Sequence, residues 1–207
     1  MRFYKNPKWF KWLYPGAIWD FFYQDDRSIY LTFDDGPNPV TTPYLLELLD
    51  QYNAKATFFC LGKQVKQYPD LFKTIRDKGH QVGNHGMEHL NGIKTTLATY
   101  LENVEQAAEL IPSRLYRPPY GKIKPKQFKA LQKKGYTVAF WSVMAYDFDA
   151  DLSSEKRITK MKDLTKNGAI FVFHDSEKCL EVLKNDLPKL MEFWKEEQYS
   201  LKTLPGK

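Results

Sequence analysis

Short apolar runs and longer amphipathic segments alternate along most of the chain. Runs rich in β-branched and aromatic residues lie at 29–33, 56–61, 80–83, 115–117, 136–141, 169–173 and, more weakly, 199–204. Segments with apolar residues at helical spacing lie between them at 43–52, 69–78, 95–110, 125–134, 153–166 and 180–196. This alternation predicts strands and helices in turn. Gly79 and Gly135 follow two of the predicted helices, where C-caps favour glycine.

Seven strand–helix units in succession favour a barrel over an open sheet. Strands joined by helices of this length run parallel through right-handed crossovers. The chain contains neither GxGxxG nor a P-loop, which are the phosphate-binding signatures of open doubly wound sheets. We therefore expect one α/β domain, a barrel of about seven parallel strands with its chemistry at their carboxyl ends.

Composition and charge narrow the class of protein. Hydrophobic residues make up 43% of the chain and charged residues 27%, as in globular proteins. The net charge is +6, but basic residues are interleaved with acidic ones and form no long run, so no nucleic-acid partner is expected. The two cysteines, Cys60 and Cys179, form no CxxC pair and do not require an oxidising compartment.

The N-terminal segment is aromatic and basic. Charged residues and Pro15 interrupt the apolar run that a signal peptide or membrane span would need, which predicts a cytoplasmic or peripheral membrane location. We expect residues 1–27 to pack their aromatic side chains on a domain formed by residues 28–207. An interfacial membrane anchor formed by residues 1–23 is the alternative, which the break at Pro15 disfavours.

Two adjacent carboxylates, Asp34 and Asp35, stand at the end of the first predicted strand. Residues 32–37 read TFDDGP, and Asp-Gly-Pro alone is ordinary turn chemistry. The alternative is that one carboxylate binds a metal and the other transfers a proton. The residues at the ends of the other strands help to decide between these alternatives, because the catalytic residues of a parallel barrel lie at the carboxyl ends of its strands.

Two histidines follow the third predicted strand, within GNHGMEHLNG. His85 and His89 are four residues apart, so a helical turn would place both imidazoles on one face, where they can bind one metal. Glu88 directly precedes His89, so the sequence is not an H-E-x-x-H motif. A third ligand must then come from elsewhere, and a carboxylate at another strand end would complete a zinc site of two histidines and one acid. Histidines of a helix surface or cap are the alternative.

Charged side chains also follow the fourth, fifth and sixth predicted strands. Arg117 precedes two prolines in RPPYG. The prolines make this loop rigid, which would hold the arginine in position to contact a carboxylate. A structural turn with an exposed arginine is the alternative. Asp147 and Asp149 lie at the end of WSVMAYDFD. His174 follows five apolar residues at a strand end, a position suited to proton transfer, whereas His80 begins a strand and is interpreted as structural.

In this order the motifs resemble a known family. TFDDGP, H-x-x-x-H, R-x-P-Y, an Asp near a Trp-containing strand and V-x-H-D are similar to the motif series of the NodB-homology polysaccharide deacetylases, carbohydrate esterase family 4. The resemblance extends over residues 28–204. It implies a distorted (β/α) barrel and hydrolysis of N-acetyl groups on an acetylated glycan, a peptidoglycan-like or chitin-like polymer or oligomer.

The resemblance also implies a metal centre and the base beside it. Asp35, His85 and His89 correspond to the family's ligands for a divalent metal, usually zinc, with cobalt or another divalent ion as alternatives. Asp34 corresponds to the base that takes a proton from the attacking water. Arg117 corresponds to the residue that tethers this base.

Three further residues correspond to the family's remaining catalytic groups. His174 matches the general acid that protonates the leaving amine, and Asp147 matches the carboxylate that orients it. The backbone N–H of Tyr120 matches the oxyanion donor.

Three positions depart from the family pattern. Gly86 replaces the usual Ser or Thr between the histidines, and its missing hydroxyl is expected to loosen His89. Met144 replaces an acidic residue and Phe148 replaces Trp, which predicts altered substrate fit with catalysis kept. An esterase of O-acetylated sugars, a deacetylase of small N-acetyl metabolites and a non-catalytic carbohydrate-binding scaffold remain as alternatives.

Overall fold

The protein is described by a computed structural model that covers residues 4, 9–23 and 26–206. Eight strands occur within these residues: β1 (Ser28–Asp34), β2 (Thr57–Cys60), β3 (Gln81–Asn84), β4 (Leu115–Tyr116), β5 (Thr137–Val138), β6 (Val143–Met144), β7 (Ile170–His174) and β8 (Ser200–Lys202). The α-helices are α1 (Phe10–Leu13), α2 (Thr41–Gln51), α3 (Gly62–Gln67), α4 (Pro69–Asp77), α5 (Leu97–Ala108), α6 (Pro125–Lys133), α7 (Ser154–Leu164) and α8 (Leu180–Glu196). Short 3-10 turns are η1 (Gly92–Lys94), η2 (Pro119–Gly121) and η3 (Glu177–Cys179).

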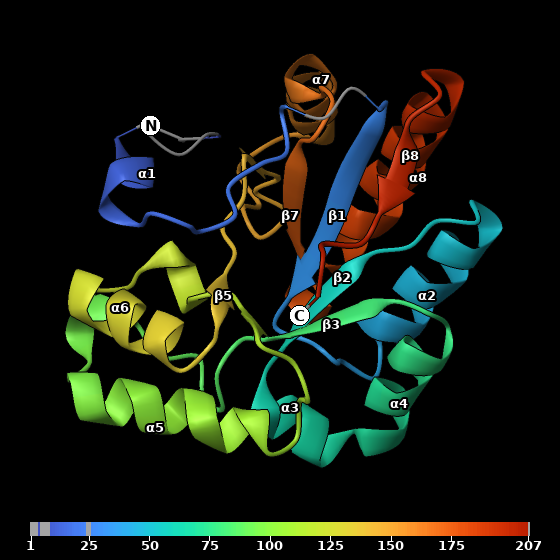
Figure 1. Ribbon diagram of the computed structural model, residues 1–207. Coiled ribbons are helices and arrows are strands. Elements are labelled where there is room, and N and C mark those ends of the chain that lie inside the picture. The colour runs from blue at the N-terminus through green and yellow to red at the C-terminus, as the bar shows by residue number, and fades with distance from the viewer. Residues whose placement is uncertain (1–3, 5–8, 24–25, 207) are drawn as a thin grey trace.

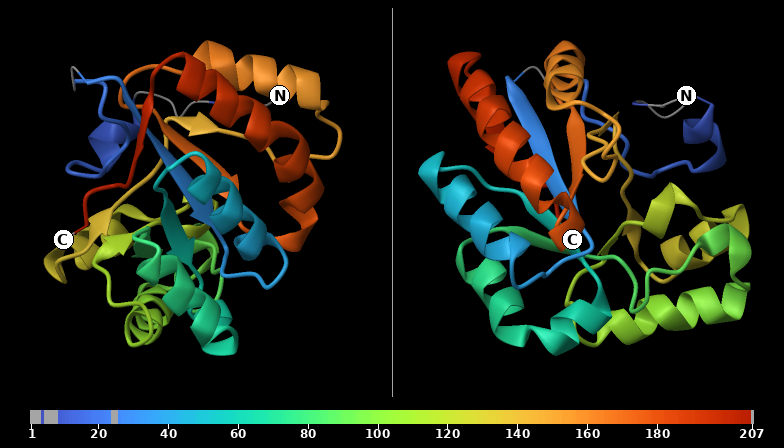
Figure 2. Two further views of the ribbon diagram at one scale, coloured as in Figure 1. Left: turned by 90° about the vertical axis from the view of Figure 1, so that its right-hand side faces the viewer. Right: turned by 180° about the vertical axis from the view of Figure 1, so that it is seen from behind.

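The strands form one curled parallel sheet with helices on its outer side (Figure 1). Its order is β5-β4-β3-β2-β1-β7-β6, and β8 pairs with β1 outside this path. Figure 2 shows from two further sides that the helices lie along the outer side of the curled sheet. The predicted distorted (β/α) barrel is confirmed.

The prediction was wrong about the run at 136–141. Only Thr137 and Val138 form β5, and the chain then crosses to the other edge of the sheet, where β6 pairs with β7. Ala139 N–H donates to the Tyr116 carbonyl, whereas Ser142 N–H donates to the Ile170 carbonyl, so the change of partner falls inside the apolar run. Periodicity does not show this change, because both parts of the run are buried.

Side chains alternate along each strand, so the sheet separates two hydrophobic clusters, one under the outer helices and one enclosed by the curl of the sheet. In β1, Ile29, Leu31 and Phe33 pack in the cluster under the helices, whereas Tyr30 belongs to the cluster enclosed by the sheet. In β7, Phe171 and Phe173 pack outward while Ile170 and Val172 pack inward. Successive side chains of a strand point to opposite faces, so Thr32 and Asp34 are the following inward residues of β1, and His174 is the following one of β7.

The described part of the N-terminal segment lies along the open side of the sheet, between β5 and β7 (Figure 1). Ile18 bridges Ala139 in parallel, and Phe21 N–H donates to the Gly168 carbonyl just before β7. Tyr14 and Trp19 are buried, and the Trp19 ring stacks on Phe140 with centroids 4.0 Å apart. These contacts make the segment part of the barrel wall.

Part of the proposed membrane anchor, residues 1–3 and 5–8, lies outside the described residues. Among the helices that are described, none has the length and apolar character needed to cross a bilayer.

Candidate active site

Asp34 and His174 are neighbours at the carboxyl edge of the sheet. They are register partners of β1 and β7, and both follow the inward alternation of their strands. The parallel pairing of an Asp-ending and a His-ending strand therefore brings a carboxylate and an imidazole to one pocket.

Arg117 anchors the carboxylate of Asp34 from inside the barrel. Its Nη1 donates to Asp34 Oδ1 at 2.8 Å and to Thr32 Oγ1 at 2.6 Å, and its Nη2 donates to the Phe140 carbonyl at 2.8 Å. The guanidinium is fully buried and lies 4.1 Å from the centroid of the Phe59 ring. A buried arginine with several fixed partners orients its carboxylate firmly.

Asp35, His85 and His89 converge beside this pair. Asp35 Oδ1 lies 3.6 Å from His85 Nε2 and 3.3 Å from His89 Nε2, and the three potential ligand atoms all lie within 4.8 Å of one another. This set of two imidazoles and one carboxylate is the donor set of a catalytic zinc site.

The surroundings prepare His85 to be a ligand. Its Nδ1 lies 2.8 Å from the Arg117 carbonyl, which can only accept, so Nδ1 carries the proton and Nε2 faces Asp35 with a free lone pair. Burial lowers the pKa of His85 to about 3, and burial also lowers the pKa of His89. Both rings are therefore neutral near pH 7, and the residues fit a divalent metal.

His174 and Asp147 form a second fixed pair at the pocket. Asp147 Oδ1 lies 2.8 Å from His174 Nδ1, and Asp147 Oδ2 accepts from the His174 backbone N–H at 2.6 Å. Burial by itself lowers the pKa of His174, but the charge and hydrogen bond of Asp147, with the charges of Asp34 and Asp35, raise it to about 9. Asp149, the other candidate of this strand end, does not line the pocket.

Cys179 lies close enough to this pair to offer a second group of potential ligands with Asp147 and His174. The thiol is fully buried, and burial together with the charge of Asp147 raises its pKa to about 12. A protonated, buried thiol is a poor ligand, so Asp35, His85 and His89 are the better metal site.

Backbone strain is concentrated around the pocket. Asp35, Tyr120 and Tyr146 have positive φ values of 80°, 60° and 57°. Non-glycine residues rarely adopt this conformation, and it occurs often at functional sites. For Asp35 it turns the carboxylate toward the histidines.

Tyr120 offers a backbone donor beside the potential metal ligands. The hydrogen bonds of the described residues leave its N–H without an acceptor. Its ring meets His89 edge-on with centroids 4.3 Å apart, and its side chain is 59% exposed. The N–H is thus available to a substrate oxygen.

These side chains line a cavity of about 500 Å³. Its lining is Asp34, Asp35, His85, His89, Tyr120, Lys122, Trp141, Met144, Tyr146, Phe148, Val172, His174 and Lys178. Arg117 and Asp147 lie behind it and hold Asp34 and His174. Sequence reasoning missed the roles of Trp141, Tyr146 and the two lysines, because nothing in their local pattern distinguishes lining residues from core or surface residues.

The match to a family model decides the relationship. The model described as polysaccharide deacetylase matches residues 23–139, which is more than half of the chain. The chain belongs to the polysaccharide deacetylase family. The resemblance noted from the five motifs, to the NodB-homology enzymes of carbohydrate esterase family 4, is thereby confirmed.

Relatives of this family member cover most of its length. A peptidoglycan-N-acetylglucosamine deacetylase of Bacillus cereus is 32% identical over 80% of this chain and 83% of its own. A chitooligosaccharide deacetylase of Azorhizobium caulinodans is 32% identical over 73% and 75%. The crystal structure of a peptidoglycan N-acetylglucosamine deacetylase in complex with 4-naphthalen-1-yl-N-oxidanyl-benzamide superposes with a TM-score of 0.88 at 28% identity, covering 97% of this chain and 95% of that one.

The departure at Gly86 has a structural counterpart in helix α5. Gly86 has a φ of 87°, and a Cβ there would lie 2.5 Å from Asn103 Nδ2. Asn103 Oδ1 accepts from the Glu88 N–H at 2.7 Å, and Asn103 Nδ2 donates to the Glu88 carbonyl at 3.1 Å. The Asn103 amide thus bonds the backbone of the loop that carries His89. The expectation that the missing hydroxyl loosens His89 stays a prediction.

Phe148 and Met144 form part of the pocket wall in this family member. Phe148 is 43% exposed, and its ring meets His174 edge-on with centroids 5.1 Å apart. An apolar wall beside the imidazole is therefore present without the Trp of the family pattern.

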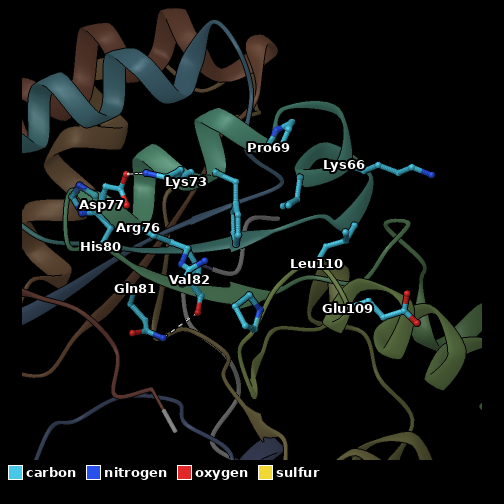
Figure 3. Close-up of a pocket in the computed structure, with 13 residues that line it drawn as sticks. Lys66, Pro69, Lys73, Arg76, Asp77, His80, Gln81, Val82, Glu109 and Leu110 are labelled. Carbon is cyan, nitrogen blue, oxygen red and sulfur yellow. Dashed lines mark hydrogen bonds and ion pairs between the residues drawn. The ribbon is translucent and has the colours of Figure 1, made fainter.

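A larger hollow of about 950 Å³ lies away from this site, beside α4 and the start of β3 (Figure 3). Lys73 there pairs with Asp77. His80 Nδ1 accepts from the Ala56 N–H, and burial lowers the pKa of His80 to about 4. The histidine of this hollow is thus neutral near pH 7 and built into the core.

Proposed function

We propose that the protein is a divalent-metal-dependent hydrolase that removes N-acetyl groups from amino-sugar polymers or oligomers. The observation that carries this proposal is the presence in one pocket of two separately anchored groups for proton transfer. Asp34 is held by Arg117 and His174 is held by Asp147, and both line the same pocket as Asp35, His85 and His89. The named activities of the relatives support the same conclusion.

Amide hydrolysis needs a base for the attacking water and an acid for the leaving nitrogen. Arg117 holds Asp34 Oδ1, so Asp34 Oδ2 is free to take the proton of the water. His174 is protonated at neutral pH because its pKa is about 9, so it can give a proton to the nitrogen as the C–N bond breaks. The products are acetate and a free amine on the sugar.

The charge that develops on the acetyl oxygen needs a donor in place before the reaction. The Tyr120 backbone N–H, held at positive φ, is the available donor beside the ligand set. A divalent metal, zinc by preference, would be held by Asp35, His85 and His89 and would supply Lewis acidity to the carbonyl and the water.

A panel of acetylated sugars tests this function. We expect the zinc-loaded protein to release acetate from N-acetylated oligomers and to leave an equal amount of free amine. His174→Ala should lower the rate by about a hundredfold to ten-thousandfold. Activity on O-acetyl esters alone, or binding of glycan with no acetate released under any divalent metal, would overturn the proposal.

A further inference from the structure

Two lysines without acidic partners stand in the lining of the catalytic pocket. Lys122 follows the turn η2, and Lys178 lies in η3 after β7, so they enter the pocket from separate parts of the sheet edge. Both residues are exposed. No ion pair involving either ammonium group occurs in residues 4, 9–23 and 26–206.

The two acidic residues of the pocket lining, and Glu88 beside it, already have partners. Asp34 is bound by Arg117 at 2.8 Å, and Asp35 faces His85 and His89. Glu88, on the loop between the two histidines, is bound by Lys63 at 2.8 Å. Within the described lining, the lysines therefore present positive charge to whatever enters the pocket.

We propose that Lys122 and Lys178 select a substrate that carries carboxylates on the sugars adjoining the hydrolysed acetamide. This inference rests on the proposed function and specifies the substrate class of the same site. An N-acetylated glycan with lactyl ether carboxylates, as in muramic acid, has this chemistry, whereas chitin-type oligomers are neutral. Lysine presents a flexible point charge, which suits carboxylates at the open rim of a groove.

The apolar part of the lining agrees with a glycan in this position. Tyr120 and Phe148 are exposed large side chains of the pocket, and Tyr146 lies beside Phe148 with ring centroids 5.7 Å apart. Aromatic faces accept the apolar faces of sugar rings but do not distinguish a neutral sugar from an anionic one. In this arrangement the lysines supply that distinction.

The experiment compares two tetrasaccharides under steady-state conditions. One alternates N-acetylglucosamine with N-acetylmuramic acid and carries free carboxylates, and the other is chitotetraose, which is equally acetylated and neutral. Lys122→Gln and Lys178→Gln are measured singly and together, with Lys→Arg variants as the charge-retaining pair. Lys129→Gln, an exposed lysine of α6 outside the pocket, is the matched control.

Each Lys→Gln change should raise KM for the anionic tetrasaccharide about threefold to fivefold, as for an ion pair at an exposed site, with kcat within about twofold. KM for chitotetraose should stay unchanged, and Lys→Arg should restore the wild-type KM. Raising sodium chloride from about 0.05 M to about 0.5 M should remove most of the wild-type preference, because salt screens exposed charges. Equal KM changes for both substrates, or none, would overturn the inference.

Calorimetric titration with the anionic tetrasaccharide separates this inference from the proposed function. If the wild type releases no acetate from either substrate, the proposed function fails. Weaker binding to the double Lys→Gln variant than to the Lys129→Gln control would still support the lysine site. Equal affinity of the two variants would contradict it.

Discussion

Asp34 and Asp35 are neighbours in sequence, yet their carboxylates have different partners. Asp34 ends β1 in extended conformation and meets Arg117 inside the barrel, whereas Asp35 has a φ of 80° and turns toward His85 and His89. The change of backbone conformation between them separates the proposed proton-transfer group from the proposed metal ligand.

This separation predicts two different phenotypes for isosteric variants. Asp35→Asn should weaken zinc binding by more than about tenfold, because it removes an anionic ligand. Asp34→Asn should retain zinc and lower kcat by about a hundredfold to ten-thousandfold. Metal content after dialysis and acetate release, measured on both variants, check this. Loss of zinc from Asp34→Asn at the level seen for Asp35→Asn would show that the roles are not separate.

The His174–Asp147 pair predicts a pH dependence of stability. The pKa of His174 is raised from 6.5 to about 9, so its pairing stabilises the folded protein fully below about pH 6.5. That contribution is lost as the pH rises through about 9. The difference in free energy of unfolding between wild type and Asp147→Asn should therefore shrink across this window.

Urea unfolding at several pH values measures this difference in the free energy of unfolding. The protein is treated with a chelator first, so that no bound cation offsets the charges of Asp34 and Asp35. The imidazole resonances of His174 should titrate near pH 9 in the wild type and at lower pH in Asp147→Asn. A His174 pKa that is the same in both proteins would contradict the pairing.

At the scale of elements, helix α5 supports the loop that carries the two histidines of the proposed metal site. Asn103 of α5 bonds both backbone groups of Glu88, and Asn84 at the end of β3 accepts from the Gly86 N–H at 2.7 Å. Gly86 leaves the space that the Asn103 amide occupies. A side-chain amide from a distant helix thus braces the loop where the family pattern has a local hydroxyl.

Asn103→Ala should consequently affect both stability and the metal. Removing the amide leaves two backbone groups unsatisfied and should cost about 1–3 kcal/mol of unfolding free energy. Zinc affinity should fall about tenfold to a hundredfold, as for other groups that orient ligands. Gln106→Ala, at an exposed position of the same helix, is the control and should change neither quantity. A competition titration against a zinc chelator gives the affinities, and an unchanged value for Asn103→Ala would contradict the brace.

At the scale of the whole molecule, the N-terminal segment connects to the active site through the barrel wall. Trp19 stacks on Phe140, and the Phe140 carbonyl accepts from Arg117 Nη2. Arg117 in turn holds Asp34. The segment therefore supports the backbone that anchors Asp34, the proposed base.

Trp19→Ala should lower the free energy of unfolding by about 3–5 kcal/mol, the cost of a large cavity in a core. Trp12 belongs to the same segment but is 87% exposed, so Trp12→Ala should stay within about 0.5 kcal/mol of wild type. Urea unfolding of the two variants provides the comparison. Similar stabilities would mean that the segment does not contribute to the folded core.

The parts of the molecule differ in how far the sequence predicts them. The barrel and the convergence of strand ends follow from periodicity, because parallel strands place their carboxyl ends at one edge. The five motifs, in their order along the chain, also predict the polysaccharide deacetylase family. The crossing between β5 and β6 was not predictable, since residues 136–144 are mostly buried on both sides of the change in strand partner. The Asn103 brace and the lysines of the rim depend on contacts between residues far apart in the chain, which no local pattern encodes.

The central claim is that the Asp35, His85 and His89 site and the Asp34 base together hydrolyse N-acetyl groups. Acetate and free amine released from an N-acetylated amino-sugar oligomer, followed before and after metal removal and zinc addition, test it most directly. We predict equal amounts of acetate and amine from the zinc-loaded wild type, almost none after chelation, recovery on adding zinc, and no recovery in Asp34→Asn. Undiminished turnover by the chelated protein, or full activity of zinc-loaded Asp34→Asn, would contradict the claim.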